Sequence, residues 1–328
     1  MRFSIALTIL LASVSLAAQQ APLVPLMFVQ TIELPNVEGR IDHLAVDRDG
    51  QQLFVAALEN NSLEVVDLRG NKHLQSIKGL HEPQGIAFVP TEKTVIVANG
   101  QSGDVQFRAG ADLAIARTVA LSEDADNVRY DAAAKRVYVG YGSGALAVID
   151  AADGKRLGEI KLAGHPESFQ LERNGARIFV NVPTAGHIAV LSRETMKVVA
   201  TWAVTGAQSN FPMALDEAGH RLFIGCRRPA KVLIFDTSSG KAVASMDVVG
   251  DTDDLFYDAA RKRVYVSGGE GFMDVFQEQN SQFSRVVHMP TAAGARTSLF
   301  VAEMSRLYLA VPHRGSQKAE IRVYEAHN

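Results

Sequence analysis

Residues 254 to 277 read Asp-Leu-Phe-Tyr-Asp-Ala-Ala-Arg-Lys-Arg-Val-Tyr-Val-Ser-Gly-Gly-Glu-Gly-Phe-Met-Asp-Val-Phe-Gln. Three apolar runs, at 255–257, 264–266 and 272–276, are separated by short polar or glycine-rich turns. Each run is too short for a helix and rich in aromatic and β-branched residues, which predicts three β-strands. Such a meander cannot bury both of its faces alone, so the rest of the chain must supply neighbours that stack on it.

The middle run of this stretch recurs along the whole chain. Its copies are Leu53-Phe-Val-Ala, Val95-Ile-Val-Ala, Val137-Tyr-Val-Gly, Ile178-Phe-Val-Asn, Leu222-Phe-Ile-Gly, Val264-Tyr-Val-Ser and Leu307-Tyr-Leu-Ala. Successive copies start 41 to 44 residues apart, and the third run recurs with them. Seven copies at this period predict an all-β fold, a seven-bladed β-propeller with four-stranded antiparallel blades and almost no helix. Charged turns such as 261–263 are expected to form a solvated face.

The two ends of the repeat predict how the ring closes. The last copy stops after its third strand, at Ile321-Arg-Val-Tyr, while Met27-Phe-Val-Gln-Thr-Ile-Glu-Leu forms a strand with no blade of its own. The N-terminal strand is therefore expected to complete the last blade as its outer strand. Closure of this kind removes an open sheet edge.

The first residues resemble a secretory signal peptide. Arg2 is the only charge before an apolar run at 5–16, and small residues follow. We expect residues 1–18 to be a signal peptide, residues 19–328 to be the propeller domain, and the protein to be periplasmic or secreted; a retained membrane anchor is the alternative. No other stretch is long enough to span a membrane. The single cysteine, Cys226, permits no intramolecular disulfide and, like Trp202, is expected to be a packing residue.

One repeat carries a resemblance to a known family. Residues 137–162 read Val-Tyr-Val-Gly-Tyr-Gly-Ser-Gly-Ala-Leu-Ala-Val-Ile-Asp-Ala-Ala-Asp-Gly-Lys-Arg-Leu-Gly-Glu-Ile-Lys-Leu. This pattern resembles the YVTN-type repeat of YncE-like propellers, and the similarity extends over roughly residues 27 to 325. The resemblance implies an exported propeller that serves as a binding module, and it implies no particular substrate.

The loops that lead into the inner strands carry the candidate site. In a propeller these loops converge on one face of the central channel, which favours a ligand site there. Alignment of the repeats gives polar residues at equivalent positions in most blades, and in the fifth blade Ser209 and Phe211. The candidate ligand-binding residues are Arg40, Asp42, His43, Glu82, Gln84, Asp124, Asp126, Asn127, His165, Glu167, Asp251, Asp253, Asp254 and Arg296.

A ring of close carboxylates repels itself unless cations relieve it, and three outcomes are open. Calcium or another divalent cation could bind through Asp126, Glu167 and Asp253, because calcium prefers oxygen ligands. Arginines could neutralise the acids instead; the candidates are Arg40, Arg227, Arg228, Arg296 and Arg314. The polar residues could also bond only to local backbone and water.

The sequence favours a binding module over an enzyme. We expect the acidic, histidine-containing central face to bind a small molecule or a protein partner, and we assign no catalytic residues. The alternative is a divalent-metal-dependent lactonase or related hydrolase in the same funnel, with His43 or His165 moving protons. Nucleic acid is an unlikely partner, since the formal net charge is −3 and the central face is acid-rich.

Overall fold

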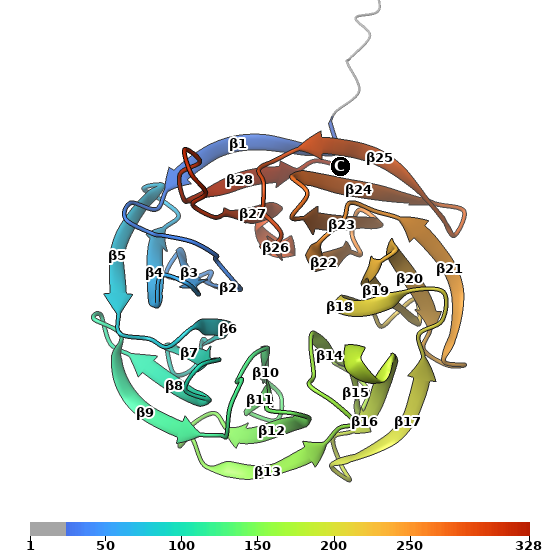
Figure 1. The fold of residues 1–328 in the computed structure, drawn as a ribbon, viewed down its shortest axis with the longest axis horizontal. Helices are drawn as coiled ribbons and strands as arrows, with labels where there is room; N and C mark the ends of the chain where they lie inside the picture. The colour runs from blue at the N-terminus through green and yellow to red at the C-terminus, as the bar shows by residue number, and fades with distance from the viewer. Residues whose placement is uncertain (1–23) are drawn as a thin grey trace, which may run out of the picture.

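The computed structural model describes residues 24–328, which form seven four-stranded antiparallel sheets arranged in a ring (Figure 1). The inner strands are β2 (Leu44–Asp47), β6 (Pro83–Val89), β10 (Val128–Asp131), β14 (Phe169–Leu171), β18 (Gln208–Asp216), β22 (Thr252–Asp258) and β26 (Ser298–Val301). The second strands are β3 (Gln52–Ala57), β7 (Thr94–Asn99), β11 (Arg136–Tyr141), β15 (Arg177–Val182), β19 (Arg221–Arg228), β23 (Arg263–Gly268) and β27 (Arg306–Val311).

The third strands are β4 (Ser62–Asp67), β8 (Asp104–Ala109), β12 (Ala145–Asp150), β16 (His187–Ser192), β20 (Ala230–Asp236), β24 (Phe272–Gln279) and β28 (Glu320–Ala326). The outer strands are β5 (Lys72–Lys78), β9 (Ala114–Ala120), β13 (Arg156–Lys161), β17 (Lys197–Ala203), β21 (Lys241–Asp247), β25 (Gln282–Pro290) and β1 (Leu26–Glu33). The helical elements in the described residues are two short 3-10 turns, η1 (Pro183–Ala185) and η2 (Ala302–Met304). The predicted seven-bladed propeller is confirmed.

The N-terminal strand closes the ring as predicted. β1 pairs antiparallel with β28, from Leu26 opposite Ala326 to Glu33 opposite Glu320. Figure 1 shows this blue strand lying along the outside of the red C-terminal blade. The last blade therefore joins the two ends of the described chain in one sheet.

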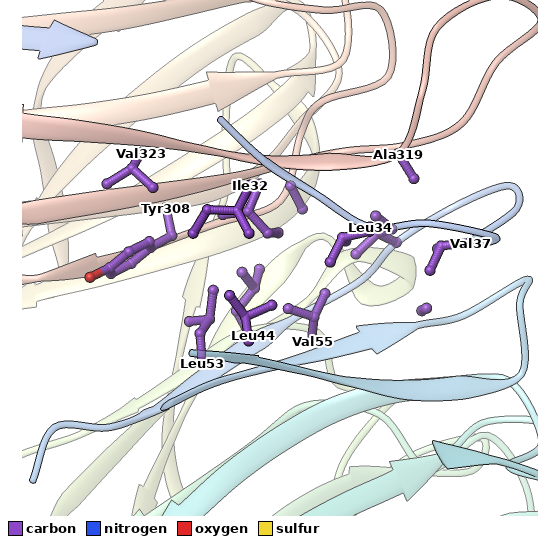
Figure 2. Close-up of a cluster of buried hydrophobic side chains, with 14 of the residues drawn as sticks. Ile32, Leu34, Val37, Leu44, Leu53, Val55, Tyr308, Ala319 and Val323 are labelled. Atoms are coloured by element: carbon purple, nitrogen blue, oxygen red, sulfur yellow. The ribbon is translucent and has the colours of Figure 1, made fainter. Parts of the chain in front are cut away.

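The core lies between neighbouring blades. The second and third strands have side chains buried on both faces, because each blade packs against a blade on either side. In the cluster between the last and first blades, Ile32, Tyr308 and Leu53 are each no more than 2% exposed (Figure 2). Full burial of one such aliphatic side chain contributes about 1.5–3 kcal/mol, so these interfaces hold the ring together.

Every outer strand contains a β-bulge at the same place, which the repeat pattern did not predict. In the fourth blade Val190 pairs with Ala200 and Leu191 with Val198, which leaves Val199 unpaired. The corresponding unpaired residues of the other blades are Val29, Leu74, Ala116, Leu157, Val243 and Val286. A bulge bends and twists an edge strand, which hinders edge-to-edge pairing with another molecule.

Individual sequence predictions have different outcomes. Cys226 is buried, and Trp202 packs with ring centroids 5.4 Å from Phe179 and 6.3 Å from Phe235, as expected. The prediction of a solvated face at 261–263 is wrong in part, because Arg263 is only 8% exposed and donates to the carbonyl of His327. The predicted signal peptide at 1–18 lies outside the described residues. Within residues 24–328 no helix is long and apolar enough to cross a membrane.

Candidate functional site

The loops before the inner strands turn sharply into the channel. Glu82, Asp124, Ser209 and Asp251 occupy equivalent positions in four blades, and all have φ between 46° and 60°. This left-handed conformation is uncommon for residues other than glycine, and short polar side chains tolerate it best. The turn directs the residues that follow toward the axis, where the blades meet.

These residues line a central cavity of about 220 Å³. The lining residues are Arg40, Asp42, His43, Gln84, Asp124, Asp126, His165, Glu167, Phe211, Arg227, Asp253 and Arg296. Blades one, three and four contribute through the loops before their inner strands, and blades two, five and six through residues near the start of β6, β18 and β22. Blade five also contributes through β19, and blade seven through Arg296. The channel mouth is thus a small polar chamber with a single aromatic wall residue, Phe211, among the described residues.

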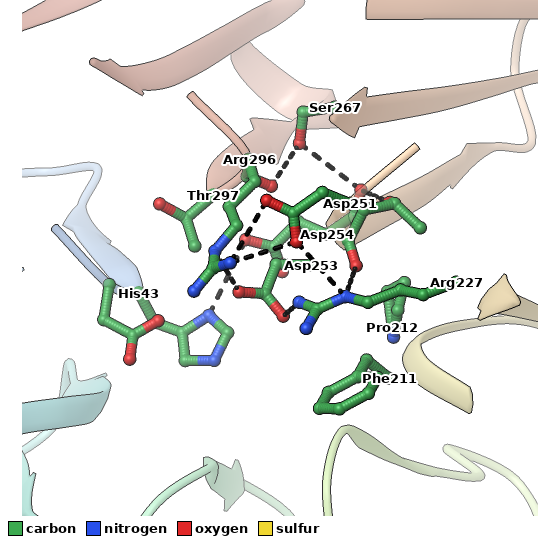
Figure 3. A network of polar contacts seen from close by, with 12 residues as sticks. His43, Phe211, Pro212, Arg227, Asp251, Asp253, Asp254, Ser267, Arg296 and Thr297 are labelled. Atoms are coloured by element: carbon green, nitrogen blue, oxygen red, sulfur yellow. Dashed lines mark hydrogen bonds and ion pairs between the residues drawn. The ribbon is translucent and has the colours of Figure 1, made fainter. Parts of the chain in front are cut away.

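Arginines surround Asp253 on one side of the cavity (Figure 3). Its Oδ1 lies 2.6 Å from Arg227 Nη2, and its Oδ2 lies 2.9 Å from Arg296 Nε and 4.0 Å from Arg40 Nη2. Arg296 Nη1 also donates to Asp251 Oδ1 at 3.0 Å. The guanidinium carbon of Arg227 lies 3.9 Å from the centre of the Phe211 ring, a cation–π contact that fixes this arginine. We call Arg40, Arg227 and Arg296 the arginine cluster.

His43 forms a separate ion pair next to the cluster. Its Nδ1 lies 3.6 Å from Asp254 Oδ2, and that carboxylate accepts a 2.9 Å hydrogen bond from the Ser298 backbone. Burial alone would lower the pKa of His43, but the charge and contact of Asp254 and the nearby Asp42 outweigh it and raise the pKa to about 10. His43 is therefore an imidazolium at neutral pH.

His165 contacts two acidic residues of the third blade, Asp124 and Asp126. Its Nδ1 donates to the carbonyl of Gly142 at 2.6 Å and lies 3.4 Å from Asp124 Oδ2, while its Nε2 lies 3.9 Å from Asp126 Oδ2. Burial acts to lower the pKa of His165, but contact with Asp126 and with the Gly142 carbonyl dominates, and the pKa rises to about 9. His165 is also cationic at neutral pH.

Asp126 has one carboxylate oxygen without a partner. The residue is 7% exposed, and its Oδ1 is buried and accepts no hydrogen bond within residues 24–328. Burial would raise the pKa of Asp126, but contact with His165 and the charge of His43 outweigh it, and the pKa is lowered. Gly85 lies tightly against this residue, since a Cβ at position 85 would be 2.2 Å from the Asp126 carbonyl oxygen.

Glu167 behaves differently from Asp126. Burial is the largest cause that raises its pKa, and the charges of Asp126 and Asp253 add to it, so that the pKa reaches about 8. Glu167 is thus mainly a neutral carboxylic acid at pH 7, able to donate a hydrogen bond into the cavity.

Most of the predicted site residues are brought together. Ten of the fourteen line the cavity, and Asp251 and Asp254 bind residues that line it. Glu82 and Asn127 do not line it. Phe211 and Arg227 also line the cavity. The alignment of the repeats places Phe211 at an equivalent position of the fifth blade, whereas the sequence predicts Arg227 only as a residue that neutralises the acids.

The three predicted metal ligands have different surroundings: Asp253 is paired with arginines, Asp126 with His165, and Glu167 has a raised pKa of about 8. Asp126, Glu167 and Asp253 line the same cavity, but within residues 24–328 no three His, Cys, Asp or Glu side chains are placed to hold one metal ion. Asp253 is paired with arginines instead. Of the predicted neutralising residues, Arg228 and Arg314 are exposed and do not line the cavity.

Comparison with known proteins gives the fold. No protein-family model matches the sequence, and no curated protein matches it. Among solved structures, Kuenenia stuttgartiensis hydrazine synthase is similar with a TM-score of 0.75 and 16% identity, over 84% of this chain and 94% of that chain. A chain of the mitotic checkpoint complex is similar with a TM-score of 0.78 and 10% identity, over 100% of this chain and 99% of that chain. At these identities the likeness supports the seven-bladed propeller fold alone.

Proposed function

We propose that this protein is a binding module whose central cavity takes a small polar ligand. The observation that carries the proposal is a cavity lined by charged side chains, one of which, Asp126, has a buried Oδ1 without a donor. A buried acceptor left without a donor costs about 1–3 kcal/mol, and more when it is charged. A ligand that donates a hydrogen bond to this oxygen removes that cost, and this favours binding of a ligand in the cavity.

A binding role fits the cavity better than hydrolysis. A general base must be unprotonated near neutral pH, whereas the pKa values of His43 and His165 are raised to about 10 and 9. The carboxylate of Asp253, one of the three predicted metal ligands, is already paired with Arg227 and Arg296 of the arginine cluster. The alternative of a metal-dependent lactonase therefore lacks both a free base and a free ligand set.

The repeat pattern supports a finer proposal about family, and the N-terminal apolar run at 5–16 supports one about location. We place the chain with the YVTN-type, YncE-like propellers and propose that it is exported after removal of residues 1–18. Determining the N-terminal residue of the protein secreted by an expressing cell tests the second point. A mature chain that still begins at Met1 would contradict it.

Ligand screening by thermal melting tests the binding proposal. A ligand present at 100 times its Kd stabilises the folded protein by about 2.7 kcal/mol, which corresponds to a rise in Tm of roughly 5 °C. The same compound should give a much smaller rise with Asp126→Asn, because the amide presents a donor or a neutral acceptor to the ligand. Asp153→Asn, in an exposed turn, is the matched control and should respond like the natural protein.

Two results would contradict the proposal. One is a broad panel of small polar compounds in which none raises the Tm. The other is a set of compounds whose effect is unchanged in Asp126→Asn and in a second cavity variant, Glu167→Gln. A calcium arm, after treatment with EDTA, belongs in the same panel; a large calcium shift lost in Asp253→Asn would favour the metal alternative.

A further inference from the structure

We infer that the ligand of the central cavity is a small carboxylate that also carries a hydroxyl or ammonium group, with the carboxylate on the arginine cluster and the donor on Asp126. This inference rests on the proposed function and names the chemical class of the ligand. It follows from which polar atoms the protein leaves unused on the two sides of the cavity.

The arginine cluster has hydrogen-bond donors to spare. A guanidinium carries five N–H donors in a planar fork. Arg227 uses Nε on the Thr252 carbonyl and Nη2 on Asp253, and Arg296 uses Nη1 on Asp251 and Nε on Asp253. Within residues 24–328 Nη1 of Arg227 and Nη2 of Arg296 donate to no protein atom, and the buried Nε of Arg40 has no partner. The two free Nη donors belong to different guanidinium groups, so a carboxylate would accept one hydrogen bond from each of these two arginines.

The opposite side of the cavity offers an acceptor. Blades three and four, which supply Asp126 and Glu167, lie across the ring from blades one, six and seven, which supply Arg40, Asp253 and Arg296 (Figure 1). Asp126 Oδ1 has no donor. His165 pairs with both Asp124 and Asp126, and the charges of His43, Arg40 and Arg129 also act on Asp126. The unpaired oxygen therefore favours a group that donates a hydrogen bond, either a hydroxyl or an ammonium.

Simpler ligands satisfy only one side. An anion without a hydroxyl group, such as sulfate or a simple carboxylate, could use the arginine donors but would leave Asp126 Oδ1 unpaired. A simple amine or a metal cation would pair Asp126 and leave the arginine donors unused. A molecule with both groups satisfies both sides at once.

The volume of the cavity favours a small ligand. At about 220 Å³ it lies below the range of roughly 300–1,000 Å³ that is usual for pockets of drug-sized ligands. A ligand smaller than a nucleotide or an oligosaccharide therefore fits it best. Phe211 supplies one apolar surface, enough for a short carbon chain between the two polar ends.

Calorimetric titration with matched four-carbon compounds tests the inference. The hydroxybutyrates and aminobutyrates carry both groups at different spacings, while butyrate and butylamine carry one group each. At least one two-ended isomer should bind about tenfold or more tightly than either one-ended compound, a difference of one decade in Kd. Whether the hydroxy or the amino series binds more tightly identifies the donor.

Two variants show which side of the cavity binds the carboxylate of the ligand and which side binds its donor group. Asp126→Asn should weaken the best two-ended compound by about tenfold while leaving butyrate unchanged. Arg227→Gln should weaken both that compound and butyrate while leaving butylamine unchanged. A melt and a circular dichroism spectrum check that each variant is folded, and Asp126→Ser, which also removes the carboxylate, replaces Asp126→Asn with the same expectation if the latter does not fold.

The outcomes separate this inference from the proposed function. If compounds that lack either the carboxylate or the donor bind best and Asp126→Asn weakens them, the cavity is a ligand site and the assigned class is wrong. If none of these compounds and none of the broad panel bind, the proposed function fails and the inference with it. Preferred binding of two-ended compounds, lost in the matching variants, supports both.

Discussion

At the scale of single residues, the two cavity histidines make stability depend on pH. The folded-state pKa values of His43 and His165, about 10 and 9, lie above the value of about 6.5 for an unfolded chain. The folded protein therefore binds more protons than the unfolded chain between pH 6.5 and 10, and the free energy of unfolding must fall as pH rises through this window. Glu167, with a pKa of about 8, adds a decline that begins near pH 4.5.

Melting curves between pH 6.5 and 10 check this expectation. The Tm of the natural protein should fall by several degrees more than that of His43→Gln, which no longer has the proton to lose. His81→Gln, at an exposed position, is the control and should follow the natural protein. Parallel curves for His43→Gln and the natural protein would contradict the paired, cationic state of His43.

The sequence predicted these residues better than their interactions. Asp42, Asp126 and Glu167 could be placed in the funnel because the period of the repeat fixes their position on each blade. The pairing of Arg227 with Asp253 could not be predicted, because it joins neighbouring blades and depends on the directions in which the two side chains point. The protonation of Glu167 could not be predicted either, since it depends on burial and on charges from other blades.

At the scale of elements, arginines at the start of second strands tie neighbouring blades together. Arg221 opens β19 and binds Asp216 of its own blade at 2.7 Å, and it binds Glu278 at 2.7 Å and the Tyr257 hydroxyl at 3.0 Å in the next blade. Arg177 has the same position in blade four and donates to the Thr237 carbonyl of blade five. These contacts join blades at the border of the apolar core, where the two guanidinium groups also lie over the rings of Phe223 and Phe179.

Arg221→Met should destabilise the protein by about 2–3 kcal/mol, because it removes the guanidinium that pairs with the carboxylates of Asp216 and Glu278 at a largely buried site. Lys231→Met is the matched control in the same blade, where the partner Asp247 is 80% exposed. An exposed pair of this kind contributes at most about 1 kcal/mol. Urea unfolding measures the loss of unfolding free energy in both variants. Equal losses would show that the contact of Arg221 between blades stabilises the protein no more than an exposed ion pair does.

The strands themselves were predictable, while the bulges in the outer strands were not. Period and residue type place every second and third strand, because these are short apolar runs between turns. A bulge adds one residue without any change of hydrophobic pattern on an exposed strand, as at Val199. The partial burial of the basic turn at 261–263 was missed for a related reason. Arg263 is covered by the ends of the last blade, which lie far away in the sequence.

At the scale of the whole molecule, the cavity exists only because the ring is closed. The lining residues come from every blade, so the arginine cluster and Asp126 face each other only while the last and first blades stay in contact. The strand that secures this contact is β1, whose Leu26 and Ile32 are 0% and 1% exposed. Beyond the sheet, the Leu34 amide donates to the Ala319 carbonyl at 2.9 Å.

Deletion of residues 26–34 should therefore lower the Tm by more than about 10 °C, since it removes several buried aliphatic side chains at roughly 1.5–3 kcal/mol each, and it should promote aggregation through the exposed edge of β28. A synthetic peptide of this sequence, added to the shortened protein, should restore part of the Tm in proportion to its concentration. Val29→Ser, at the exposed bulge of the same strand, is the control and should leave the Tm nearly unchanged. A shortened protein that melts like the intact chain would mean that the ring stays closed without β1, and the cavity would then depend on the contact between blades alone.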